Sequence, residues 1–183
     1  YKANRNETPD AIKIAVPYIQ AILKAMQIPI LVKSGYEADD IIGTVAKNAE
    51  QNNYEVFMVT PDKDFAQLVS ENIFMYRPAR MGNGIEIWGV DEVQKKFEIT
   101  DPLQVIDFLG MMGDSVDNIP GLPGVGEKTA KKFLAEYGSM EKLLENTDKI
   151  KGKLREKIEL NKDKGLLSNC LLYTSDAADD TPC

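Results

Sequence analysis

Acidic side chains are concentrated in three short segments, each flanked by glycine, proline or asparagine. The segments are GYEADD at 35–40, TPDKD at 60–64 and GDSVDN at 113–118. Side chains three residues apart share one face of a helix, as Glu37 and Asp40 would. Side chains two residues apart point to the same side of an extended chain, as Asp62 and Asp64 would. Each segment can therefore present at least two carboxylates together.

Carboxylates gathered in this way need cations, since two like charges about 4 Å apart cost about 4 kcal/mol at an effective dielectric constant of about 20. Mg²⁺ suits carboxylate oxygens combined with water. Two ions about 3.5–4 Å apart favour attack on a phosphodiester, because one activates water and the other stabilises the leaving oxygen. The chain has no histidine to assist a nucleophile instead. We therefore predict a site for two Mg²⁺ or Mn²⁺ ions, with the ligands Glu37, Asp39, Asp40, Asp62, Asp64, Asp114 and Asp117.

A single acidic segment would favour a structural role. Two aspartates at a helix start are usually a cap or a dipole partner, and Asp-x-Asp after a strand is usually a turn. Two of the segments follow predicted strands, and sites assemble at the carboxyl ends of parallel strands. The three segments together favour the metal site.

A glycine-rich segment, IPGLPGVGEKTA at 119–130, runs directly into a predicted helix. Glycine lets a backbone approach a phosphate closely, and the first amides of a helix point outward as donors. Lys128, Thr129 and Lys132 could add contacts, so the segment would hold a DNA backbone without reading its sequence. It is not a P-loop, because Glu127 separates Gly126 from the lysine. A plain helix–turn–helix packing element is the structural alternative.

Hydrophobic periodicity predicts the elements that position these segments. Strands are expected at 29–32, 54–60, 72–76 and 85–88, and helices at 8–27, 37–51, 65–69, 91–97 and 102–111. Pro17 should kink or divide the first helix. A turn is expected at 81–84, and the strand at 85–88 can pair beyond it. The alternation of strands and helices indicates a mostly parallel α/β sheet. Beyond Asp114 only helices are expected, at 127–137, 140–146 and 153–164.

The formal net charge of −7 at first argues against a nucleic-acid partner. Three of the acids lie beyond residue 170 and seven are the candidate metal ligands, and setting these ten aside turns −7 into +3. Acids concentrated where cations sit are compatible with DNA binding. No apolar run approaches the roughly 18–20 residues of a membrane span, so we expect a cytoplasmic protein.

Five segments in this order resemble the 5′–3′ exonuclease domain of bacterial DNA polymerase I and, more broadly, the flap-endonuclease family. They are YKANR, GYEADD, TPDKDFAQLV, FLGMMGDSVDNIPG and LPGVGEKTA. The resemblance implies a PIN-like core over 1–112, incomplete at its N-terminus, and a helix–three-turn–helix DNA-binding subdomain over 113–169. It also implies a structure-specific 5′–3′ exonuclease or flap endonuclease that cuts DNA by two-metal-ion catalysis in replication and repair.

The resemblance assigns roles to single residues. Asp39, Asp62 and Asp64 are the expected catalytic ligands, and the other four carboxylates complete the inner and water-mediated shells. Lys2 and Arg5 match the end of a helical arch, where cations neutralise the scissile phosphate. The expected DNA-binding residues are Lys2, Arg5, Gly121, Gly124, Val125, Gly126, Lys128, Thr129 and Lys132, with K⁺ at the hairpin. The implied partner is flapped, nicked or branched duplex DNA, bound by a monomer.

The two ends of the chain depart from this family. The family begins well upstream, with a first core strand and further metal-binding aspartates, so we expect this polypeptide alone to cleave poorly. A polymerase portion would lie downstream in the parent protein. From Cys170 the sequence CLLYTSDAADDTPC resembles a translated sequencing adapter, so 170–183 is expected to be an artefactual, disordered tail; a natural disordered terminus is the alternative. Both cysteines fall within it, so their number says nothing about disulfides.

Two other functions remain open from the residues. A PIN-type ribonuclease shares the acidic α/β core, although it has little use for a duplex clamp. A non-catalytic DNA-binding module would use the hairpin and keep the acids as structural groups. Cleavage of 5′-flap DNA compared with single-stranded RNA separates the first alternative, and magnesium titration separates the second.

Overall fold

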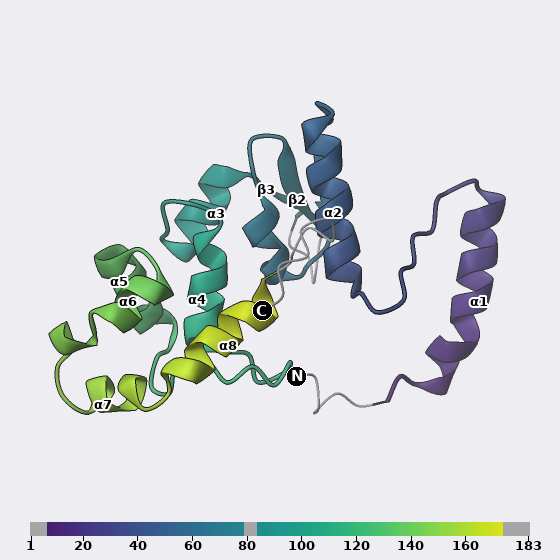
Figure 1. Ribbon diagram of the computed structural model, residues 1–183. Helices are drawn as coiled ribbons and strands as arrows, with labels where there is room; N and C mark the ends of the chain where they lie inside the picture. Colours follow the sequence, from purple (N-terminus) through teal and green to yellow (C-terminus); the bar gives the residue numbers. More distant parts are fainter. Residues whose placement is uncertain (1–6, 79–83, 174–183) are drawn as a thin grey trace.

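The computed structural model describes residues 7–78 and 84–173, which form a small sheet with helices around it and a helical region beside it (Figure 1). The elements of the first part are α1 (Asp10–Ala25), α2 (Ala38–Gln51), β1 (Val56–Val59), the 3₁₀ helix η1 (Lys63–Leu68), β2 (Ile73–Arg77), β3 (Glu86–Trp88), α3 (Val90–Phe97) and α4 (Gln104–Met112). Those of the second are α5 (Glu127–Tyr137), α6 (Met140–Glu145), the 3₁₀ helix η2 (Thr147–Lys149), α7 (Lys153–Glu159) and α8 (Lys162–Leu172). Except for Gly84, the turn predicted at 81–84 lies outside the described residues.

The sheet has the strand order β1-β2-β3. β1 runs parallel to β2, with Val56 opposite Ile73, and β2 runs antiparallel to β3, with Met75 opposite Trp88. The described sheet is therefore mixed, whereas the sequence predicted a mostly parallel one. The connection from β2 to β3 explains the difference, because a short link can join antiparallel strands while parallel strands need a long crossover.

The core continues from the sheet into the helices. Met75 and Ile73 on β2 are fully buried, and the helix α2 packs against β1 and β2 while α3 packs against β3. Aromatic rings extend this core, with Phe97 edge-on to both Trp88 and Phe108. Helix α4 then contacts η1 on one side and α5 and α8 on the other. It therefore joins the sheet to the helical region and fixes the second and third acidic segments relative to each other.

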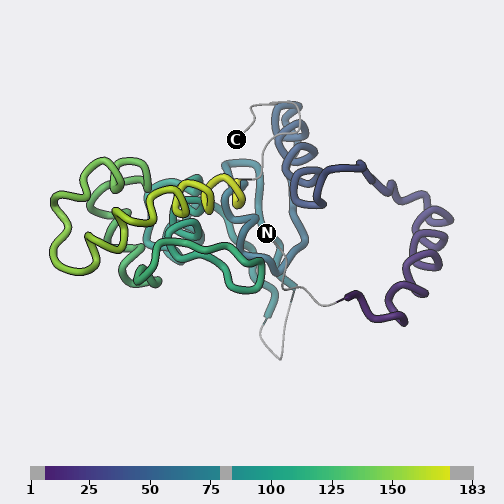
Figure 2. Tube along the Cα trace, turned by 60° about the horizontal axis from the view of Figure 1, so that its bottom comes forward, coloured from purple at the N-terminus to yellow at the C-terminus, as the bar shows by residue number. Residues whose placement is uncertain are grey.

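The helical region contains the elements predicted after Asp114, with one change. The predicted helix at 127–137 is observed as α5 with the same bounds, whereas the single helix predicted at 153–164 is observed as α7 and α8. Figure 2 shows α8 returning along α4, in yellow beside green and teal. This return carries the end of α8 back toward the sheet.

The segment before α2 lies apart from this core. Figures 1 and 2 both show α1 separated from the other elements, and α1 buries none of its residues. Pro17 lies inside this one continuous helix and does not divide it. The buried strand predicted at 29–32 is wrong, because these residues form no strand and Val32 is 80% exposed. An apolar run specifies neither its pairing partner nor the surface that would cover it.

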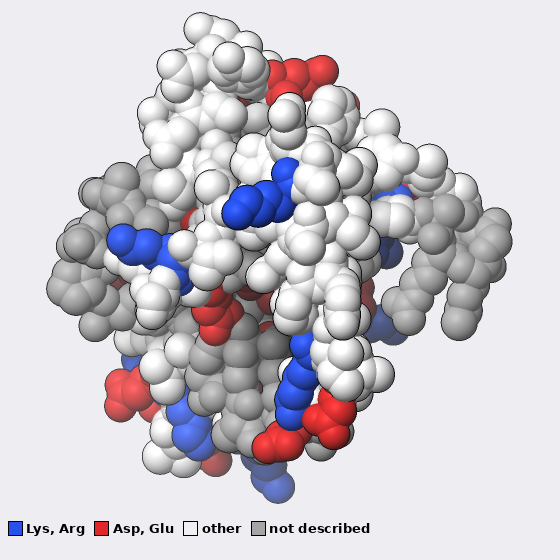
Figure 3. All heavy atoms as spheres, turned by 90° about the vertical axis from the view of Figure 1, so that its right-hand side faces the viewer, with Lys and Arg blue, Asp and Glu red and all other residues white. Residues whose placement is uncertain are grey.

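The surface on the α1 side is unevenly charged. Figure 3 shows mostly residues other than Lys, Arg, Asp and Glu in its upper part, and basic and acidic side chains next to one another lower down. The exposed apolar side chains of α1 include Ile12, Ile19 and Ile22. None of the described helices combines the length and apolar character that crossing a membrane requires.

Candidate metal and DNA site

Carboxylates from all three acidic segments line one pocket of about 300 Å³ between α2, η1, the loop after α4 and the end of α8. Its lining residues are Glu37, Asp39, Asp40, Asp64, Asp117, Ile119, Cys170, Leu171, Leu172 and Tyr173. The remaining two candidates are close by, since the charges of Asp62 and Asp114 act on Asp64. Side chains distant in the sequence thus meet in one place, which is the arrangement a shared ion site needs.

One carboxylate in each segment orders the local backbone. Asp40 Oδ2 accepts a hydrogen bond from the Glu37 N–H at 3.0 Å, at the start of α2. Asp62 Oδ1 accepts from the Asp64 N–H at 3.1 Å, at the start of η1. Asp114 Oδ1 accepts from the Val116 N–H at 2.8 Å. The capping roles considered as alternatives are therefore present, and they coexist with the convergence of the segments.

Asp64 is the most strongly perturbed of these groups. Burial, together with the negative charges of Asp62, Asp114 and Asp117, raises the pKa of its carboxyl to about 6, while the charge of Lys63 opposes the rise. Asp64 Oδ1 is buried and has no hydrogen-bond partner within the described part of the chain. A buried carboxylate oxygen without a partner is costly, so this atom is suited to a cation that would sit in the pocket.

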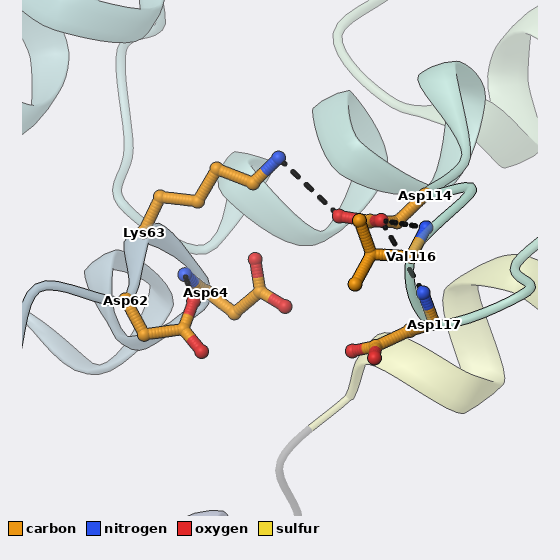
Figure 4. Close-up of polar contacts among 6 residues, drawn as sticks. All are labelled: Asp62, Lys63, Asp64, Asp114, Val116 and Asp117. Atoms are coloured by element: carbon orange, nitrogen blue, oxygen red, sulfur yellow. Dashed lines mark hydrogen bonds and ion pairs between the residues drawn. The ribbon is translucent and has the colours of Figure 1, made fainter. Parts of the chain in front are cut away.

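The donor set fits a hard divalent cation, because every residue that the three segments contribute to the pocket lining carries a carboxylate. Over the described ranges, no three His, Cys, Asp or Glu side chains already converge on one ion position. Ion binding would therefore require the carboxylates to rotate toward one another. Figure 4 shows Asp64, Asp114 and Asp117 around a common space into which such rotations would lead.

Lys63 places a positive charge among these acids. Its Nζ lies 3.6 Å from Asp114 Oδ2, so the ion pair connects η1 with the loop after α4 (Figure 4). The motif containing Lys63 was recognised from the sequence, but only its aspartates were given a role. No sequence signal identifies the partner of this lysine, because the pair depends on the packing of α4 against η1.

Arg77, at the end of β2, contacts the start of the second acidic segment. Its Nη2 donates to the Pro61 carbonyl at 3.2 Å, and its Nη1 donates to Glu86 Oε2 at 3.2 Å. The guanidinium lies 4.1 Å from the ring centroid of Trp88, whose Nε1 also donates to Glu86. Sequence reasoning missed this residue, although an arginine ending a strand beside a tryptophan-containing strand is a usable signal.

The end of α8 closes one side of the pocket. Gln67, on η1, is buried and donates both to the Asp64 carbonyl and to the Leu172 carbonyl, each at 2.9 Å. Residues 170–172 belong to helix α8, which contradicts the disorder predicted for them. The buried side chain of Leu172 explains the extension, because it packs into the core. Residues 174–183 lie outside the described residues, as do Lys2 and Arg5.

The glycine-rich segment divides into a buried half and an exposed half. A Cβ on Gly121 would lie 2.5 Å from the Gly113 N, and one on Gly113 would lie 2.6 Å from the Ile119 carbonyl oxygen. The Gly121 N–H donates to Ser168 Oγ at 3.0 Å, and Val125 is buried. Gly121 and the side chain of Val125 thus have packing roles, so the DNA contacts predicted for them are not available without rearrangement.

The exposed half of the segment retains groups suited to a phosphate backbone. Gly124 and Gly126 are exposed, and Gly126 caps the N-terminus of α5. Lys128 and Lys132 are exposed on α5, whereas Thr129 is half-buried. Helix-start amides beside two lysines form a surface that attracts anions.

Two family models match consecutive parts of the chain. Residues 1–98 match the model of a family described as 5′–3′ exonuclease, N-terminal resolvase-like domain. Residues 100–179 match a second, described as 5′–3′ exonuclease, C-terminal SAM fold. The two matches meet near the start of α4, earlier than the boundary at 112 predicted from the sequence, and the division of the chain stays a prediction.

Two bacterial proteins are similar to most of the chain. DNA polymerase I of Bacillus subtilis is 45% identical over 169 residues, which are 92% of this chain and 19% of that protein. A 5′–3′ exonuclease of Aquifex aeolicus is 43% identical over 150 residues, which are 82% of this chain and 50% of that protein. The chain thus spans about a fifth of the polymerase and half of the exonuclease.

Solved structures show the same fold. The bacteriophage T5 5′-exonuclease with bound zinc has a TM-score of 0.78 at 20% identity, covering 94% of this chain and 64% of the phage chain. The T5 flap endonuclease in a complex with DNA and metal ions has a TM-score of 0.76 at 19% identity, covering 93% and 62%.

Proposed function

Because the chain belongs to the 5′–3′ exonuclease family, we propose that it forms the metal-binding and DNA-gripping part of a structure-specific 5′-nuclease. The substrate would be a 5′ flap or a nicked or branched DNA duplex, cut by hydrolysis of a phosphodiester during replication or repair. The convergence of the three acidic segments on one pocket carries this proposal. Separate helix caps and turns would not require the segments to meet.

We assign the seven carboxylates to a site for two Mg²⁺ or Mn²⁺ ions. Asp39, Asp62 and Asp64 are the candidate catalytic ligands, and Glu37, Asp40, Asp114 and Asp117 the candidates for the remaining positions. Bound ions would supply activation of the attacking water and charge stabilisation of the leaving oxygen. The chain's contribution is to bring the three segments to one pocket, where the hydrogen bonds accepted by Asp40, Asp62 and Asp114 order the local backbone. Lys2 and Arg5 remain proposed phosphate contacts.

The exposed half of the glycine-rich segment would hold the duplex. Gly124, Gly126, Lys128, Thr129 and Lys132 surround the start of α5, where helix amides and ammonium groups can contact phosphates. A monovalent cation such as K⁺ at this turn is part of the same proposal. These contacts position a duplex and do not select a base sequence, which suits an enzyme that recognises the shape of a junction.

A pair of matched substrates tests the proposed function. The purified chain is mixed with a 5′-flap DNA duplex or with single-stranded RNA of equal length, and binding and cleavage are measured with Mg²⁺ and with EDTA. We expect tighter binding of the flap duplex, and any cleavage to require Mg²⁺ and to be lost in Asp64→Asn. Because the chain spans part of its relatives, the cleavage rate is expected to be low. Preference for the RNA would support the ribonuclease alternative and overturn the proposal.

The DNA-binding module without catalysis is tested separately by metal binding. It predicts that titration with Mg²⁺ gives no heat from the acidic pocket, while DNA binding persists. The buried, unpartnered Asp64 Oδ1 favours the metal-binding alternative. A polymerase in the same parent chain, a monomeric state and a cytoplasmic location complete the proposal, and sequencing of the parent gene, sedimentation and cell fractionation test them.

A further inference from the structure

One lysine lies within the set of acids that the proposed function assigns to metal ions. The Lys63 ammonium is 3.6 Å from Asp114 Oδ2, and its charge also acts on Asp64, where it opposes three neighbouring carboxylates. The ion pair joins two segments that are otherwise brought together by the packing of α4 on η1. Lys63 therefore reduces the repulsion among the acids in the absence of any other cation.

The same lysine conflicts with a bound divalent ion. An ion held by Asp114 would lie within several ångströms of the ammonium, and like charges at that separation repel even in a water-like dielectric. Lys63 can resolve the conflict by moving, since its side chain is 44% exposed and carries its charge on a flexible four-carbon stem. The Asp114 side chain is 24% exposed and its Oδ1 accepts a hydrogen bond from the Val116 N–H, so the lysine is the more mobile partner.

We propose that Lys63 is an internal counter-ion that holds the second and third acidic segments together before metal binds and gives up Asp114 when a divalent ion arrives. This role rests on the proposed function, because it presumes that the pocket receives such ions. Lys63 is thus a positioning residue: it acts through Asp114 and Asp64. Its position makes the metal-free site stable at the expense of metal affinity.

The test compares Lys63→Gln with the wild-type chain in two measurements at low ionic strength. Calorimetric titration with Mn²⁺ gives the affinity, and thermal unfolding in EDTA and in saturating Mn²⁺ gives the stability of each state. We expect the variant to bind Mn²⁺ on the order of tenfold more tightly, because a nearby positive charge is removed. In EDTA its Tm should fall by about 2–4 °C, and with Mn²⁺ this deficit should disappear.

Two variants control the comparison. Lys63→Arg keeps the charge and should stay close to the wild type in both measurements. Lys47→Gln removes a lysine in a similar ion pair, 3.3 Å from Glu50 and farther along α2, and should leave the Mn²⁺ affinity unchanged. The fold-change in affinity must also match the difference between the two stability changes, since they are linked by one thermodynamic cycle.

Each other outcome is decisive. Equal Mn²⁺ affinity in the wild type and Lys63→Gln, with equal stability losses in EDTA and Mn²⁺, would show a purely structural lysine and overturn this proposal alone. Unchanged stability together with unchanged Mn²⁺ affinity in Lys63→Gln would show that the ion pair affects neither state and would overturn the proposal as well. No Mn²⁺ binding by either chain would overturn the proposed metal site and this proposal with it.

Discussion

Asp64 and Asp117 face the same pocket, although one follows β1 and the other follows α4. Burial raises the pKa of Asp64, and the charge of Asp117 is among the neighbouring charges that add to this effect. A protein without a use for the pair would gain stability by separating or neutralising these groups. Keeping them together therefore lowers the stability of the metal-free chain.

Neutralising Asp64 should stabilise the metal-free chain. Its folded-state pKa of about 6 lies above the ordinary 3.8, so the folded protein holds the proton more tightly than the unfolded chain. The ionised Asp64 carboxylate therefore destabilises the folded state. This loss of stability is complete above pH 6, shrinks as the pH falls through 6, and is gone below about 4. At pH 7.5 Asp64→Asn should therefore raise the free energy of unfolding in EDTA by roughly 1–3 kcal/mol, measured by urea denaturation.

The pH dependence provides the control for Asp64. At pH 4 the wild type and Asp64→Asn should unfold at nearly the same urea concentration. Asp10→Asn, at an exposed position on α1, should change little at either pH. A lower stability of Asp64→Asn at pH 7.5 would contradict the cause we assign to the raised pKa.

Arg77 should stabilise the loop before Asp62 because its two terminal guanidinium nitrogens donate hydrogen bonds to different partners. Arg77→Met removes hydrogen bonds to Pro61 and Glu86 and the stacking on Trp88, so we expect a loss of roughly 2 kcal/mol in unfolding free energy. Arg77→Lys keeps a cation near the ring but lacks the two guanidinium donors, and should lose less. Arg155→Met, which breaks a surface pair on α7, should cost at most about 0.5 kcal/mol. Equal losses of unfolding free energy in Arg77→Met and Arg155→Met would contradict a stabilising role of Arg77 at this loop.

Gly121 should be required for packing. Alanine there would place a Cβ 2.5 Å from the Gly113 N at a φ of +61°, so we expect Gly121→Ala to cost roughly 3–5 kcal/mol. Gly138 has a φ of +82° but open space around it, and Gly138→Ala should cost only roughly 1 kcal/mol. Comparing the two by denaturant unfolding separates close contact from backbone strain. A small loss of unfolding free energy in Gly121→Ala would contradict the packing role and favour the predicted DNA contact of Gly121.

The exposed lysines of α5 should contribute electrostatically to DNA affinity. Lys128→Gln and Lys132→Gln should each weaken binding of a flap duplex. Each should also lower the slope of log affinity against log salt by about 0.9 for every phosphate that is no longer neutralised. Fluorescence anisotropy at several salt concentrations measures both quantities. Lys47→Gln, on α2 and far from α5 in Figure 1, should leave the slope unchanged; the same drop there would indicate general attraction to the chain.

Local patterns in the sequence predicted much of the fold. The helix at α5 and the strands β1 and β2 follow from periodicity and β-branched residues, which act over a few neighbours. The apolar run at 29–32 failed because a strand needs a partner that periodicity does not name. The pairing of 85–88 beyond the predicted turn was also predictable, because a short turn joins antiparallel strands, and β3 pairs antiparallel with β2.

The acidic segments of the site could be predicted from the sequence, but the tertiary contacts around them could not. The aspartates stand out because closely spaced carboxylates repel one another and so indicate a bound cation. The structure brings their segments together. The packing contacts of Gly121 could not be predicted, because glycine serves close approach to a phosphate and close approach to backbone equally well; its DNA contact stays a prediction. Lys63, Arg77 and Gln67 were missed because each acts through a tertiary contact with a residue distant in sequence.

The central claim is that the three acidic segments share divalent ions, and a nuclear magnetic resonance titration with substoichiometric Mn²⁺ tests it most directly. The paramagnetic ion broadens amide signals near it. We predict that the signals of Asp39, Asp64 and Asp117 broaden together at the same low Mn²⁺ concentration, before those of the exposed acids Asp91 and Glu92 on α3. Broadening confined to one segment, or spread equally over all exposed acids, would contradict the shared site.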